Sequence, residues 1–182
     1  MNNIQKCKDI LEHLNNKDTK IIEKEDFKGS YYSYINDTIY LSGENKITKS
    51  KEEEFIILCH ECIHSIQNKT LQAVNFYSSN IEIILSILVI LLLIIKVNFV
   101  KYLVIPYFLI MLLNIIVRFL LEKDAVKGSF KLAKDIIKDD KYDISKIESM
   151  KDEAKTKQIV FYLSLFWKKI LKTVIILILI CL

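Results

Sequence analysis

Arginine is nearly absent from this chain. Arg118 is the only arginine among the 26 basic residues, and the net charge over 182 residues is only +4. Surfaces that bind nucleic acid usually combine a strong positive balance with arginine side chains that bind phosphate through two parallel hydrogen bonds. We therefore expect no nucleic-acid partner.

The chain also lacks the marks of a secreted protein. Residues 1–9 are polar and contain no short apolar core followed by a small-residue cleavage site, so no secretory signal is predicted. The four cysteines form no disulfide framework. Cys59 and Cys62 make a C-x-x-C pair, but no second pair accompanies it. We interpret both as buried or idle thiols in a reducing compartment, and not as metal or redox groups.

Charge is missing from two long stretches in the middle of the chain, residues 83–95 and 102–117. Uninterrupted apolar stretches of about this length predict helices that cross a bilayer. We expect the first span at about 79–95, where it is slightly short, and the second at about 102–121. Together they predict a transmembrane helical hairpin.

Lysine residues distinguish the two ends of this hairpin. Four lysines closely follow the second span: Lys123, Lys127, Lys131 and Lys134. The connecting loop holds only Lys96 and Lys101. Because positive residues are enriched on the cytoplasmic side of membrane proteins, we expect the polar parts of the chain to lie in the cytoplasm.

The remaining sequence predicts a mainly α membrane protein with a small N-terminal β-hairpin. Apolar spacing predicts an amphipathic helix over 4–14. Turn residues separate two expected strands, near 30–35 and 38–41. Ser50 followed by Glu53 is typical of a capping box, and it opens a helix that we expect to continue to about residue 71.

We therefore expect four parts. Residues 1–78 form a cytoplasmic N-terminal part with the β-hairpin and the helix that starts near 50, and residues 79–121 form the transmembrane hairpin. Residues 122–157 form a charged cytoplasmic helical segment, broken near Asp139-Asp140. Residues 158–182 form an interfacial or partly membrane-inserted C-terminal helix, because lysines divide its apolar runs.

The helix that starts near 50 contains the sequence CHECIHSIQ, with His60, Glu61 and His64 in the order His-Glu-x-x-His (HExxH). Residues four apart project from the same helix face, so both imidazoles can bind one metal ion. Glu61 projects roughly 100° around from His60, where it can take a proton from zinc-bound water without being a ligand. The motif predicts a catalytic Zn2+ site and peptide hydrolysis, with Glu61 as general base.

A catalytic zinc needs a third protein ligand and one open position. His13 is the only other histidine, and it lies on the remote first helix. Glu122 is the first acidic residue after the apolar hairpin, on the same side as the two histidines. We expect Glu122 to be the third ligand, with Asp124 as the alternative. The competing interpretation is that the histidines are solvated on a helix of mixed polarity.

Zinc peptidases often hold an extended substrate against the edge of a strand. The strand at 38–41 is a candidate to offer that edge by β-augmentation. We assign no oxyanion role to the tyrosines of the hairpin, because tyrosine in strands more often serves packing.

The order of these pieces resembles the bacterial membrane-bound neutral zinc metallopeptidases, the YugP-like group. The matching residues fall within about 30–135: Tyr32, Leu41-Ser42, His60-Glu61, His64, Ile66-Gln67, Glu122 and Asp124-Ala125. The resemblance implies a zincin-type helix, zinc held by the two histidines and Glu122, Glu61 as general base, and proteolysis at or near a membrane. The family usually has Gly and Ala where this chain has Ile63 and Ser65, and Ile63 could narrow the cleft.

We therefore expect a membrane-associated zinc endopeptidase that acts on proteins or peptides at the cytoplasmic membrane face. The alternative is a non-catalytic zinc-binding membrane interaction or immunity protein of the same fold. Intact Glu61 argues against it, because a purely structural zinc site needs no general base. A third interpretation, a transporter or channel component, is suggested by Glu82, Asn114 and Arg118, but two spans would have to oligomerise to form a pore.

Overall fold

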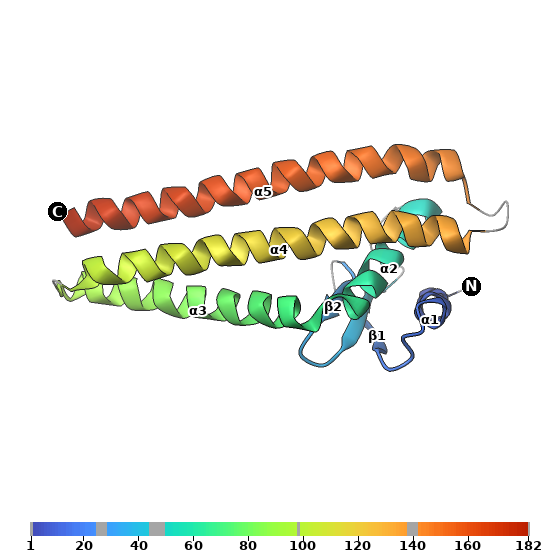
Figure 1. Ribbon diagram of the computed structural model, residues 1–182, viewed down its shortest axis with the longest axis horizontal. Helices are drawn as coiled ribbons and strands as arrows, with labels where there is room; N and C mark the ends of the chain where they lie inside the picture. The colour runs from blue at the N-terminus through green and yellow to red at the C-terminus, as the bar shows by residue number, and fades with distance from the viewer. Residues whose placement is uncertain (1, 25–28, 44–49, 98, 138–141, 182) are drawn as a thin grey trace. The chain divides into compact units, whose positions relative to one another are not determined.

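The computed structural model describes residues 2–181 except 25–28, 44–49, 98 and 138–141, and it is mainly helical with one small sheet (Figure 1). Its elements, in chain order, are α1 (Asn3–His13), β1 (Lys20–Lys24), β2 (Tyr31–Ser33), β3 (Thr38–Ser42), α2 (Lys51–Ile66), α3 (Lys69–Ile94), α4 (Val100–Ile136) and α5 (Ile144–Cys181). They divide into two compact units. The first unit is Met1–Lys69 with Leu121–Thr156, and the second unit is Thr70–Leu120 with Lys157–Leu182.

The sheet has the strand order β1-β3-β2. The predicted hairpin is confirmed: β2 and β3 are antiparallel, with Tyr32 opposite Ile39, and Asp37 turns the chain with a φ of 46°. β1 was not predicted, because its mostly exposed residues show no alternating apolar pattern. It pairs in parallel with the other side of β3. β3 is therefore the middle strand, and the prediction that it offers a free edge to a substrate is wrong.

The start of α2 is confirmed, and its predicted end is wrong. The Ser50 side chain accepts a hydrogen bond from the backbone amide of Glu53, as an N-cap does. The helix ends at Ile66 because Gln67 has an extended backbone, and α3 begins separately at Lys69. The sequence has neither glycine nor proline at this end, so the predicted helix continued past it.

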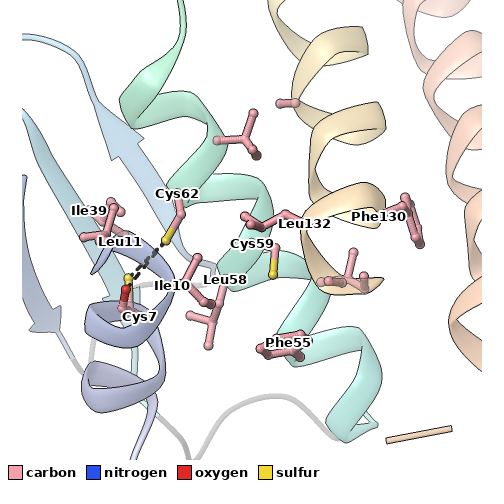
Figure 2. Packing of buried hydrophobic residues seen from close by; sticks show 14 of the residues in the cluster. Cys7, Ile10, Leu11, Ile39, Phe55, Leu58, Cys59, Cys62, Phe130 and Leu132 are labelled. Carbon is pink, nitrogen blue, oxygen red and sulfur yellow. Dashed lines mark hydrogen bonds between the residues drawn. The ribbon is translucent and has the colours of Figure 1, made fainter. Parts of the chain in front are cut away.

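The core of the first unit forms around α2 (Figure 2). Cys59 and Cys62 are fully buried, and the Sγ of Cys62 lies 3.5 Å from that of Cys7 in α1. Apolar side chains from α1, β3, α2 and α4 surround them, among them Ile10, Leu11, Ile39, Leu58, Phe130 and Leu132. Burial raises the pKa of the Cys59 thiol, which keeps it protonated and unreactive. The expectation of buried free thiols is confirmed for these cysteines.

α4 approaches α2 closely at Gly128. A Cβ atom at position 128 would lie 3.1 Å from the Ile63 side chain, so the glycine leaves room for Ile63 between the two helices. Ile63 is 8% exposed and belongs to the core. It therefore fills the contact between α2 and α4 and does not narrow a cleft.

Among the residues that the structure describes, two helices are long and apolar enough to cross a membrane: α3, with 26 residues, and α4, with 37. Only 22% and 28% of their most apolar stretches are buried. An equally apolar core helix of a soluble protein is mostly buried, so the exposure favours association with a membrane. The spans predicted at 79–95 and 102–121 lie almost entirely within these helices, which extend beyond them.

The end of the chain is one continuous helix. α5 has 38 residues and continues through position 157, where the sequence analysis divided the chain. The C-terminal helix expected at 158–182 is the second half of α5, and its lysines do not interrupt it. The break expected near Asp139-Asp140 lies outside the described residues.

Candidate metal centre

His60, His64 and Glu122 meet in the first unit. The two histidines project from α2, and their Nε2 atoms are 3.1 Å apart. Glu122 comes from α4, and its Oε2 lies 3.3 Å from the Nε2 of His60 and 3.8 Å from that of His64. Within the part of the chain that the structure describes, these are the residues whose ligand atoms converge closely enough to hold a metal ion.

The spacing of the three atoms fits an ion of the size of zinc. A point equidistant from atoms at these separations lies roughly 2 Å from each, which is the length of Zn–N and Zn–O bonds in proteins. Two imidazoles and one carboxylate are also a donor set of catalytic zinc sites that keep one position open. The side chains are 15% to 32% exposed, so solvent reaches the group.

Glu122 is held in the ionised form that binds a metal. Burial raises the pKa of Glu122, but its contacts with His60 and His64 have the larger effect and leave that pKa well below its ordinary value. Burial lowers the pKa of His64, yet its contact with Glu122 raises it above the ordinary value.

Gln67 orients the His64 ring. Its side-chain Nε2 donates to the carbonyl oxygen of Leu121 at 2.6 Å and to Oδ2 of Asp124 at 2.9 Å. Both partners only accept, so the Oε1 of Gln67 must face Nδ1 of His64, 2.7 Å away. Nδ1 then carries the hydrogen of the neutral ring, and Nε2 keeps its lone pair toward Glu122.

Replacing Gln67 with alanine is expected to weaken zinc binding about 10–100-fold, the usual cost of losing a partner that orients a ligating histidine. The physical reason is that His64 would lose the acceptor that fixes its ring and tautomer. Competition with a coloured zinc chelator measures the change. Gln5→Ala, on the exposed face of α1, is the matched control and should bind zinc like the wild type. Equal affinity in both variants would contradict the orienting role.

Glu61 lies beside the three residues without belonging to their group. Its side chain is only 8% exposed, and its Oε2 accepts a 2.7 Å hydrogen bond from the backbone amide of Tyr32 in β2. Burial raises the pKa of Glu61, and the nearby His60 and His64 counteract this only in part. The outer strand of the sheet therefore fixes the carboxylate that follows the first histidine.

A polar network holds this strand in place. The Tyr32 hydroxyl donates to Oδ1 of Asp37 at 2.6 Å, and burial together with this bond raises the pKa of Tyr32. Lys69 donates to the same hydroxyl at 2.8 Å, and to the carbonyl oxygen of Ser65 in α2 at 3.0 Å. The turn between β2 and β3 is thus tied to the end of the helix that carries both histidines.

The other residues considered from the sequence lie apart from the group. His13 is exposed on α1, and Asp124 accepts the Gln67 amide. No role was predicted from the sequence for Gln67 or for the Tyr32 amide. For Gln67 a signal existed, because a residue three positions after His64 falls near the same helix face. The Tyr32 contact leaves no such signal, because a backbone amide has no side-chain identity.

No protein-family model matches the chain, and no curated protein or solved structure gives a match. The case for a function therefore depends on the site itself. That site consists of two histidines one helical turn apart, a carboxylate from a second helix, and a buried glutamate held by a strand amide.

Proposed function

We propose that this protein is a membrane-associated zinc metallopeptidase of the zincin type, similar to the YugP-like group. The observation that carries the proposal is the convergence of His60, His64 and Glu122, whose ligand atoms all lie within 4.8 Å of one another. The HExxH order supports it, because it places a glutamate next to a ligand on the same helix.

Each residue has a separate role in this proposal. His60, His64 and Glu122 hold the zinc, which when bound would polarise a substrate carbonyl and make a water molecule more acidic. Glu61 takes the proton from water and passes it to the leaving amine. The Tyr32 amide restricts the rotation of the Glu61 carboxylate, so that proton transfer starts from a fixed position.

The substrate edge proposed from the sequence has to be reassigned. β3 is paired on both sides, whereas β2 is an outer strand and contacts α2 through the bond from Tyr32 to Glu61. An extended peptide that adds to a sheet needs an unpaired edge. The Tyr32 amide of this edge is already bonded to Glu61, so we propose that the substrate lies along β2 next to Glu61.

The proposed location is a cell membrane, which the chain crosses more than once, with the site on the cytoplasmic side. The apolar, largely exposed surfaces of α3 and α4 support the membrane location. The lysines that follow the apolar part of α4 support the cytoplasmic position of the site, because positive residues near membrane spans are enriched in the cytoplasm.

Peptide hydrolysis that depends on zinc tests the proposal. Full-length protein in detergent is expected to cleave a mixture of quenched fluorescent peptides, to lose this activity in a strong zinc chelator, and to recover it with stoichiometric Zn2+. The fluorescence increase measures cleavage, and mass spectrometry identifies the products. Zinc-loaded protein that cleaves nothing, in detergent or in lipid vesicles, would contradict the peptidase and favour the non-catalytic interaction protein.

A further inference from the structure

The second half of α5 distributes its side chains in an unusual way. Lys169, Lys172 and Thr173 all contact α3 or α4. Apolar side chains of the same half are largely exposed: Val160, Phe161, Leu163, Trp167, Leu171, Val174, Ile175 and Ile178. A helix on a soluble protein shows the reverse, with its apolar face covered. Apolar residues outside and ionisable residues inside are typical of a helix surrounded by lipid.

An ion pair joins α5 to α3. The Lys169 Nζ lies 2.7 Å and 2.5 Å from the two carboxylate oxygens of Glu82, and the side chains are only 19% and 12% exposed. Asn114 of α4 donates to the same carboxylate at 2.6 Å and accepts from Ser79 at 2.9 Å. Glu82 is thus neutralised by one helix and hydrogen-bonded by another, as ionisable groups inside a bilayer require.

A second contact continues in the same direction along α3. Lys172 donates to the Ser86 hydroxyl at 2.5 Å, one turn beyond the pair of Lys169 with Glu82. Its Nζ also lies 5.9 Å from the centre of the Tyr107 ring. Because both sequences advance together, α5 runs parallel to α3, with Lys169 beside the residue that precedes the uncharged stretch 83–95 of α3.

Against α4 the order is reversed. The Tyr162 hydroxyl donates to the carbonyl oxygen of Arg118 at 3.4 Å, and Thr173 contacts the sulfur of Met111 at 3.7 Å. Ile176 packs into an apolar cluster with the first residues of α4. α5 therefore accompanies the apolar parts of α3 and α4 over their length. Residues 157–181 extend about 37 Å as a helix, against a hydrocarbon thickness of about 30 Å.

We propose that residues 157–181 form a third membrane-spanning helix, which presents its apolar face to lipid hydrocarbon and is fixed to α3 by the ion pair of Lys169 with Glu82. This rests on the proposed membrane location of α3 and α4. It places the two ends of this segment on opposite sides of the membrane, and it replaces the interfacial helix expected from the sequence. Lys168, the neighbour of Lys169 in the sequence, is exposed and lies outside the ion pair.

Three epitope tags on the full-length protein test the inference: before Met1, after Lys96 in the connection from α3 to α4, and after Leu182. Protease accessibility is measured in sealed membranes of both orientations. The tags after Lys96 and Leu182 should be digested on one side and the tag before Met1 on the other. A tag after Lys96 on the same side as Met1 would contradict the membrane hairpin itself. If the tag after Leu182 lies on the same side as the tag before Met1, and the tag after Lys96 lies on the opposite side, the third span is overturned.

Charge variants test the ion pair. Lys169→Glu places two carboxylates together, and their repulsion should prevent α5 from crossing the membrane. In most chains we then expect the tag after Leu182 on the same side as the tag before Met1. The double variant Glu82→Lys/Lys169→Glu restores opposite charges and should restore the crossing. Lys168→Glu is the matched control, since it changes the same charge one residue earlier, and it should behave like the wild type. Equal behaviour of Lys168→Glu and Lys169→Glu would show that the ion pair does not fix α5.

Discussion

Alanine at His60, His64 or Glu122 is expected to remove stoichiometric zinc from the purified protein. Each substitution deletes one of the three atoms that lie 3.1 to 3.8 Å apart. Losing only an outer partner costs roughly 10–100-fold in affinity, so losing a ligand should cost more than about 100-fold. Metal analysis of the protein after gel filtration in detergent measures the zinc content, and circular dichroism verifies that each variant keeps its helices.

Two variants separate ligands from neighbours. His13→Ala removes the remaining histidine. Asp124→Asn removes the carboxylate of the alternative third ligand, which is also the acidic residue nearest to Glu122 in the sequence. Both should keep zinc. Zinc lost from the histidine variants but retained in Glu122→Ala would move the third ligand elsewhere. Wild-type protein that binds no zinc after reconstitution would remove the basis of the proposed peptidase.

Replacing Glu61 with glutamine is expected to leave zinc binding intact and to lower peptide hydrolysis about 10²–10⁴-fold, the usual contribution of a general acid–base residue. The side chain keeps its size, and its amide oxygen can still accept the Tyr32 amide hydrogen, so the contact with β2 should persist. What disappears is the ability to accept a proton from water. The assay compares turnover at equal zinc content.

Glu53→Gln provides the control for this variant, because Glu53 lies in the first turn of the same helix and outside the group of three. Its turnover should equal that of the wild type. A zinc-binding interaction or immunity protein would show no measurable difference among the wild type, Glu53→Gln and Glu61→Gln. Undiminished hydrolysis by Glu61→Gln would assign the proton transfer to another group.

Several features of the fold could be predicted because local sequence determines them. The amphipathic spacing of α1, the turn residues before β3 and the cap at Ser50 each act within a few positions of the chain. The meeting of the two histidines follows from helix geometry in the same way. Glu122 was reached differently, through the expectation that a membrane hairpin returns the chain to its starting side.

The remaining features depend on contacts between distant segments. β1 is a strand because β3 pairs with it, and its own sequence carries little apolar pattern. α2 ends where Gln67 turns to reach Leu121 and Asp124, more than fifty positions away. The pairing of Lys169 with Glu82 likewise requires knowledge of how α5 lies against α3. Without it, a lysine in an apolar run indicates an interfacial helix.

The hydrogen bond from Tyr32 makes the two carboxylate oxygens of Glu61 inequivalent. Oε2 accepts the Tyr32 amide, with 2.7 Å between oxygen and nitrogen, so we propose that Oε1 is the oxygen that receives a proton. A glutamine amide has one oxygen that accepts and one nitrogen that donates. Since the Tyr32 amide also donates, the oxygen of a glutamine at position 61 must face it, and the nitrogen takes the place of Oε1. The Glu61→Gln substitution therefore reverses the hydrogen-bonding polarity at one atomic position while the side chain keeps its shape.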